Sequence, residues 1–206
     1  MMRIDTIVVG PMQVNCYILS SKATKNAILI DSGDEYAKLK VFLEKHKLTP
    51  KFIVHTHGHI DHIQADNEFN LAVYAHSLDV ELLKSPERNL SNFLNVPFRV
   101  KFDVKPLEDS QIITLDDFSL QVIHTPGHTP GGICLKSAKA AFTGDTLFAA
   151  GIGRTDFPGA SYEQLMKSIQ DKLLVLPDDT IIYPGHGPCS TIGREKKGNP
   201  FLSTFA

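Results

Sequence analysis

Metal-ligand side chains are concentrated in the stretch from Thr56 to His62, directly after a predicted strand. The order Thr-His-Gly-His-Ile-Asp-His supplies His57, His59, Asp61 and His62 as candidate ligands. Neutral imidazole nitrogen and carboxylate oxygen bind zinc at roughly 2.0–2.2 Å. Donors that alternate at i and i+2 can direct two rings at one ion. The stretch is therefore predicted to be a metal-binding loop, and the alternative is a solvated polar turn that happens to be rich in histidine.

Three further candidate ligands repeat one local pattern, in which a strand is followed by a glycine turn and a metal-type side chain. They are His128 in Thr-Pro-Gly-His-Thr-Pro-Gly-Gly, Asp145 in Thr-Gly-Asp-Thr, and His186 in Tyr-Pro-Gly-His-Gly. Loops held by rigid strands are common places for functional sites. We therefore expect these side chains to meet the first loop at one edge of the fold.

Short strand-like runs alternate with amphipathic segments along the chain. The predicted strands are 4–9, 14–19, 27–30, 51–55, 72–75, 112–115, 118–124, 132–136, 140–142 and 180–183. One helix is predicted from the capping signal at Ser32 to about residue 46. Further helices are predicted over 61–69 and 76–83, and from 161 to Pro177. Capping-box spacing is present at Ser32 and Glu35, and again at Ser161 and Gln164. The pattern predicts an α/β sandwich of two sheets with helices on the outer faces.

Residues 84–106 contain Pro86, Pro97 and Pro106 and show little periodicity. Two interpretations remain open for this segment. It is either a lid that faces a substrate or an ordinary surface connection.

Composition excludes several classes of function. The 206 residues include 21 basic and 23 acidic side chains, for a net charge of −2, which indicates neither a nucleic acid nor an anionic membrane as partner. The short basic run 194–197 is interpreted as a solvated face. We expect no signal peptide and no membrane-spanning segment. Cys16, Cys134 and Cys189 have no CxxC spacing, which makes a disulfide scaffold improbable and favours a cytoplasmic location.

The ordered set His-x-His-x-Asp-His, then His, Asp and His, resembles the metallo-β-lactamase superfamily over nearly the whole chain. Residues 151–157 (Gly-Ile-Gly-Arg-Thr-Asp-Phe) and 183–188 (Tyr-Pro-Gly-His-Gly-Pro) resemble small single-domain members of its glyoxalase II branch, the hydroxyacylglutathione hydrolases. The resemblance implies an αβ/βα four-layer sandwich of two mixed sheets flanked by helices. It also implies one domain over residues 1–206, without the helical C-terminal extension that helps two-domain members to hold glutathione.

The resemblance further implies a role for each candidate ligand of two divalent metal ions. The first ion would be bound by His57, His59 and His128, the second by Asp61, His62 and His186, and both by a bridging Asp145. The implied catalytic groups are Asp61 and a metal-bound water held by Asp145. Zinc is the expected metal, and iron and manganese are alternatives because mixed nitrogen and oxygen ligands accept all three.

Two more residues match positions with a role in this family. Asp31 ends a predicted strand and would orient a ligand from behind, whereas its alternative is a plain turn carboxylate in Asp-Ser-Gly. Arg154 would contact substrate, and its alternative is a surface or structural arginine.

The chemistry of such a site favours hydrolysis. A metal ion lowers the pKa of bound water from 15.7 towards about 7 and can polarise a carbonyl. A thiolate, with a parent pKa of about 8.5, leaves without much help from an acid. The sequence therefore predicts a metal-dependent thioester hydrolase, with S-lactoylglutathione as the type of small-molecule substrate.

Three alternatives stay open at this point. The first is hydrolysis of a lactone or another ester. The second is a persulfide dioxygenase, in which His57, His128 and Asp145 would hold a single iron and which the stretch 153–157 also resembles. The third is a module that binds metal without turnover. The sequence does not predict an oligomeric state.

Overall fold

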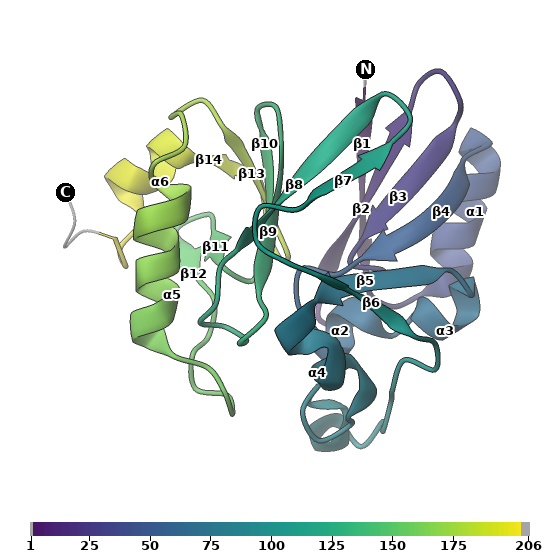
Figure 1. The fold of residues 1–206 in the computed structure, drawn as a ribbon, viewed down its shortest axis with the longest axis horizontal. Coiled ribbons are helices and arrows are strands. Elements are labelled where there is room, and N and C mark those ends of the chain that lie inside the picture. The colour runs from purple at the N-terminus through teal and green to yellow at the C-terminus, as the bar shows by residue number, and fades with distance from the viewer. Residues whose placement is uncertain (1, 203–206) are drawn as a thin grey trace.

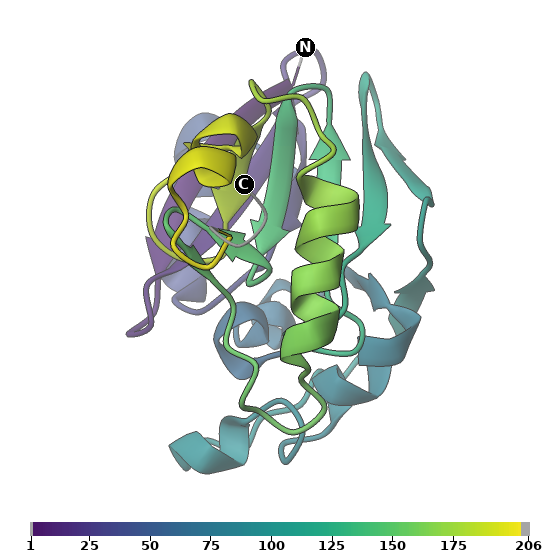
Figure 2. The same ribbon diagram turned by 90° about the vertical axis from the view of Figure 1, so that its left-hand side faces the viewer.

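Two six-stranded mixed sheets pack against each other, with helices on the outer side of each, in the computed structural model, which describes residues 2–202 (Figures 1 and 2). Figure 1 shows α1 (Tyr36–His46) beyond the first sheet on the right, and α5 (Tyr162–Ser168) and α6 (Ile192–Gly198) beside the second sheet on the left. This arrangement confirms the predicted α/β sandwich.

The first sheet pairs six strands in the order of the chain. Neighbours are antiparallel from β1 to β3 and parallel from β3 to β6. The strands are β1 (Met2–Val9), β2 (Val14–Ser21), β3 (Asn26–Ile30), β4 (Thr49–Val54), β5 (Ala72–His76) and β6 (Val104–Leu107).

The second sheet contains the later strands, and only β10 and β13 in it are parallel. Its spatial order is β14 (Ser190–Thr191), β13 (Ile181–Pro184), β10 (Ala140–Gly144), β9 (Ile133–Ser137), β8 (Phe118–His124) and β7 (Ile112–Leu115). A two-stranded ribbon of β11 (Leu147–Phe148) and β12 (Gly151–Ile152) accompanies it.

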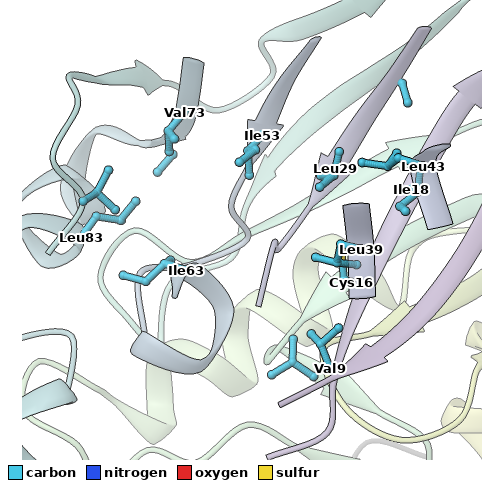
Figure 3. Packing of buried hydrophobic residues seen from close by; sticks show 14 of the residues in the cluster. Val9, Cys16, Ile18, Leu29, Leu39, Leu43, Ile53, Ile63, Val73 and Leu83 are labelled. Carbon is cyan, nitrogen blue, oxygen red and sulfur yellow. The ribbon is translucent and has the colours of Figure 1, made fainter. Parts of the chain in front are cut away.

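The four layers follow from the alternation of side chains along strands that are buried on both faces. Every residue of β2 is buried. Its Cys16 and Ile18 face a cluster beneath α1, whereas Tyr17 and Leu19 face the cluster between the two sheets. Figure 3 shows Cys16, Ile18 and Leu29 packed with Leu39 of α1. Similarly, Cys134 of β9 packs with Leu165 and Ile169 on the outer side of the second sheet.

Most predicted strands are confirmed, with ends that shift by a few residues. The prediction for 112–115 and 118–124 agrees with the structure at both ends. Ser161 also caps α5 as predicted, because its side chain accepts a hydrogen bond from the Gln164 amide. That helix continues as a π-helical turn over Ile169–Leu173.

The prediction of a capping box at Ser32 and Glu35 is wrong. Ser32 donates its hydroxyl proton to Asp66 at 2.6 Å, and Glu35 accepts from the Gly10 amide at 2.9 Å. Both side chains are thus engaged by distant partners, and Glu35 enters α1 with a left-handed φ of 55°. Tertiary contacts override the local capping signal here.

The single helix predicted over 61–69 is two short helices, α2 (Ile60–Ile63) and α3 (Asp66–Phe69). The helix is interrupted at Ala65, whose amide donates a hydrogen bond to the Gly33 carbonyl at 2.7 Å. The helix predicted over 76–83 is a 3-10 turn, Ser77–Asp79, followed by α4 (Val80–Lys84).

The segment 84–106, for which the sequence left two interpretations, contains the 3-10 turn η2 (Ser91–Leu94) and the edge strand β6, neither of which was predicted. Within residues 2–202, none of the helices has the length and apolar character needed to cross a membrane.

Candidate metal centre

The seven predicted ligands converge on one place, where loops from both sheets meet. The loop after β4 and the helix α2 contribute four of them, and the loops after β8, β10 and β13 contribute one each. Three groups have ligand atoms that all lie within 4.8 Å of one another. They are His57, His59 and His128; His57, His62 and Asp145; and Asp61, His62 and His186.

Distances between ligand atoms fit shared cations. Nε2 of His62 lies 3.5 Å from Oδ1 of Asp145, while Nε2 of His128 and of His186 lie 3.6 Å from its Oδ2. Two ligands of a tetrahedral zinc, each at about 2.1 Å, are separated by roughly 3.4 Å. Oδ2 of Asp145 thus lies beside one imidazole from each of the two proposed ligand sets, a position from which this carboxylate could bridge two ions.

The hydrogen bonds of four of the five candidate histidine ligands leave one ring nitrogen free for a metal. Nδ1 of each of these four faces an oxygen that can accept its hydrogen bond, so that Nε2 carries the lone pair when the ring is neutral. The pairs are His57 with the Thr56 hydroxyl (3.2 Å), His62 with Asp31 (3.0 Å), His128 with the Arg154 carbonyl (2.7 Å) and His186 with the Met12 carbonyl (3.0 Å).

Buried atoms without partners supply the test of fit. Among the described residues, Nε2 of His57, His62 and His128 and Oδ1 of Asp145 are buried and make no hydrogen bond. A buried polar atom without a partner is costly. Because these atoms point at one another, the residues fit two divalent cations.

The charge states of the imidazoles depend on their carboxylate neighbours. Burial lowers the pKa of His57 and His59 well below the usual range, which keeps both rings in the neutral form that binds metals. Burial also acts to lower the pKa of His62, but Asp61, Asp31 and Asp145 together raise it to about 10. A cation at Nε2 of His62 would take the place of that proton.

Asp31 lies directly behind the ligands and contacts two of the segments that carry them. Its carboxylate accepts hydrogen bonds from the amide of Thr56 at 2.8 Å and its hydroxyl at 2.7 Å, as well as from His62. Burial acts to raise the pKa of this carboxyl, but His62 and His55 hold it well below the usual range. Asp31 thus bonds both to a candidate ligand and to the residue that precedes another candidate ligand.

Sequence reasoning missed a buried network that extends this contact. His55 lies between Asp31 and Asp66, 2.8 Å from the latter, and Asp66 also accepts from Ser32. All four side chains are at most 1% exposed. One signal could have found His55, because it lies directly after β4 and two residues before His57.

Asp79 was missed as well. This buried carboxylate accepts from the Gly58 amide (3.1 Å), the Thr129 hydroxyl (2.8 Å) and the Gly131 amide (2.7 Å). It therefore ties the first ligand loop to the turn that carries His128. Nothing in the local sequence around Asp79 indicates this link.

Arg154 lies at the rim of the site with its guanidinium exposed. It forms two hydrogen bonds with Asp156, at 3.0 and 2.7 Å, and lies 4.3 Å from the ring centre of Phe157. Its backbone carbonyl, rather than its charge, makes the contact with the ligand His128.

Comparisons with known proteins agree with this geometry. Residues 9–186 match the family model described as the metallo-beta-lactamase superfamily. The chain is 39% identical to hydroxyacylglutathione hydrolase GloC of Haemophilus influenzae, over 98% of this chain and 99% of that protein.

Solved structures of similar sequence also have names from this superfamily. The chain is similar to the BLEG-1 B3 metallo-beta-lactamase (37% identity, TM-score 0.92, 98% of this chain and 100% of that one) and to TTHA1623 in a di-iron-bound form (36%, 0.84, 96% and 100%). ETHE1 from Myxococcus xanthus is more distant, with 26% identity, a TM-score of 0.81, and 98% and 85% coverage.

Proposed function

This chain belongs to the metallo-β-lactamase superfamily as a metal-dependent hydrolase, and we propose that its substrate is a thioester of the hydroxyacylglutathione type, similar to S-lactoylglutathione. The observation that carries the proposal is the convergence of seven imidazole and carboxylate side chains on one place, where five of them line a cavity. The identity with GloC supports the choice of a glutathione thioester as the first substrate to test.

The metals, when bound, lower the pKa of coordinated water and polarise a substrate carbonyl. Two such ions, with zinc expected and iron or manganese as alternatives, would be held by the seven ligands. Asp61 orients the attacking water. Burial acts to raise the pKa of Asp61, but His62 and His186 hold it well below the usual range, so that its carboxylate is ionised at neutral pH and can accept a hydrogen bond from the water.

The residues around the cavity favour a leaving group that departs as an anion. Among its described lining residues, the titratable ones are the candidate ligands and the ion pair of Arg154 with Asp156. A thiolate needs no proton donor to leave, whereas an amide nitrogen does. This supports a thioester over a lactam.

The proposed setting is the reducing cytoplasm, with residues 1–206 acting as one domain on a small molecule. The three cysteines are free in the part of the chain that the structure describes. The match with GloC over 98% of this chain supports the treatment of these residues as one domain.

The test combines elemental analysis of the purified protein with a substrate panel of S-lactoylglutathione, lactones, a β-lactam and glutathione persulfide. We expect two metal ions per chain and thioester hydrolysis. Asp61→Asn is expected to lower kcat/KM by roughly 10²-fold or more, because it removes the charged group that holds water. Asp171→Asn, at an exposed position on the π-helical turn Ile169–Leu173, is the matched control and should leave kcat/KM unchanged.

Two other results would contradict the proposal. One is unchanged thioesterase activity in Asp61→Asn or His59→Ala. The other is one iron per chain with oxygen uptake on the persulfide. Efficient β-lactam cleavage without thioester cleavage would support instead the activity in the name of BLEG-1.

A further inference from the structure

The cavity beside the candidate ligands is lined by two chemically different sets of side chains. Its volume is about 680 Å³, and five of the candidate ligands form the first set. The second set consists of apolar side chains from four separate segments of the chain: Met12, Leu90, Phe93, Leu94, Phe148 and Phe157. Apolar walls with a few polar groups at one end are typical of sites for small molecules that carry a hydrophobic part.

Charge inside the cavity does not favour an anionic group beside the apolar residues. Apart from the candidate ligands, Arg154 is the one cationic side chain among the described residues that line it, and Asp156 already pairs with it through two hydrogen bonds. The negative charge of Asp61 and Asp145 would be offset by the cations that they are proposed to hold. A substituent that packs against the apolar residues therefore finds no unpaired cationic side chain.

The wall formed by Leu90, Phe93 and Leu94 is built on a buried polar scaffold. Asn89 donates to the Phe98 carbonyl at 2.9 Å and accepts from the Ser91 amide at 3.0 Å, while the Ser91 hydroxyl accepts from the Phe98 amide at 2.9 Å. Asn89 and Ser91 are both 0% exposed. The turn is thus held in one conformation.

This fixed turn presents large apolar side chains to solvent. Phe93 is 74% and Leu94 is 47% exposed. The same turn is joined to the metal loop, because the amide of Ile60, between two candidate ligands, donates to the Asn89 carbonyl at 2.9 Å. An exposed apolar surface held rigidly against the reacting groups indicates a function in binding.

From these observations we propose that the preferred substrate is a thioester with an uncharged alkyl or aryl substituent, which packs against Leu90, Phe93 and Leu94 while the carbonyl faces the ligands. The inference rests on the proposed thioester hydrolysis and narrows its substrate class. The proposal also gives a role to the segment 84–106, for which the sequence left two interpretations: its residues 90–94 would determine substrate specificity.

The test uses two series of substrates, since the substituent can lie on either side of the scissile bond. One series lengthens the acyl group on glutathione from lactoyl to hexanoyl, and the other lengthens the alkyl thiol of acetyl thioesters from ethyl to hexyl. We expect kcat/KM to rise about tenfold along at least one series, because each added methylene is removed from water. The series that responds identifies the side.

The double variant Phe93→Ser/Leu94→Ser should abolish the dependence on chain length. Val96→Ser is the matched control, because Val96 is 50% exposed in the same segment but does not line the cavity. This control should retain the wild-type dependence. A flat profile in both series, or an unchanged slope in the double variant, would refute the inference.

A binding measurement separates this inference from the proposed function. Ketone analogues, in which a methylene replaces the sulfur, are titrated calorimetrically into the metal-loaded protein and the two variants. Affinity should rise with chain length in the wild type and in Val96→Ser only. Failure to hydrolyse any thioester would refute the proposed function, whereas length-independent binding of the ketones would refute the apolar site. A wild-type dimer that the double variant dissociates would identify the wall as a subunit interface and would also refute it.

Discussion

At the scale of single residues, Asp31 is a side chain outside the candidate ligand set that bonds directly to it. It accepts hydrogen bonds from Thr56 and from the ligand His62, and it adopts a left-handed φ of 53°. Asparagine tolerates this backbone conformation, so that a change of charge can be separated from a change of fold.

Asp31→Asn is predicted to lower metal affinity by about 10–100-fold. An amide nitrogen cannot accept a hydrogen bond from His62 or Thr56, and the imidazole of His62 therefore loses its orientation. Titration against a chelator of known affinity measures the effect. Asp116→Asn is the control, since Asp116 has a φ of 49° but is exposed and bonds to Thr24 and Asn26. Equal affinities in the two variants would show that Asp31 does not orient the ligand.

The sequence was informative about residues that stand in turns after strands. His128, Asp145 and His186 could be predicted because each follows a strand and a glycine in the sequence itself. Asp66 and Asp79 could not, because their importance lies in partners far along the chain: Gly131, for example, is 52 residues from Asp79. Buried polar networks of this kind depend on the tertiary fold.

At the scale of elements, α5 supports the turn that carries His128. The amide of Ser161 donates to the Gly127 carbonyl at 2.8 Å, and the Ser168 hydroxyl donates to the Pro126 carbonyl at 2.7 Å. The helix approaches so closely that a Cβ on Gly127 would lie 2.3 Å from the backbone of Leu165.

Gly127→Ala is therefore predicted to lower the free energy of unfolding by about 2–4 kcal/mol, because Gly127 has a φ of +140° and its Cβ would displace α5. Urea denaturation measures the change. Gly198→Ala, where a Cβ would meet nothing within 4 Å, should change it by less than about 0.5 kcal/mol. A similar small effect at Gly127 would mean that α5 moves away freely.

Strands with continuous apolar runs could be predicted closely, since both of their faces are buried. Short edge elements could not: β14 has two residues, and β6 contains Pro106 and two exposed positions. Their pairing comes from the sheet that they join rather than from their own composition. The capping signal at Ser32 failed for a related reason, because Asp66 takes up its hydroxyl.

At the scale of the whole molecule, the candidate metal ligands lie where loops from the two sheets meet. Removal of the metals is predicted to lower the Tm by about 5–10 °C, since ions that bind only the folded state stabilise it by about 3 kcal/mol at a hundredfold excess over Kd. Thermal denaturation before and after chelation, with metal content measured, tests this. Re-addition of the metal should restore the Tm.

The double variant His57→Ala/His62→Ala serves as the control for the chelator. It should show no change of Tm on chelation, because each of the three ligand groups loses at least one member. A wild-type Tm that stays constant after the metals have been removed would contradict a role for them in joining the sheets.

Every ligand group draws two members from the loop after β4 and α2, and one from a loop of the second sheet. If the halves were expressed as separate polypeptides, the first would offer each of the two cations two side chains, and the second would offer each one histidine together with the shared Asp145. Reconstitution of activity from such fragments would therefore depend steeply on metal concentration. The cations would themselves hold the two fragments together in the reconstituted complex.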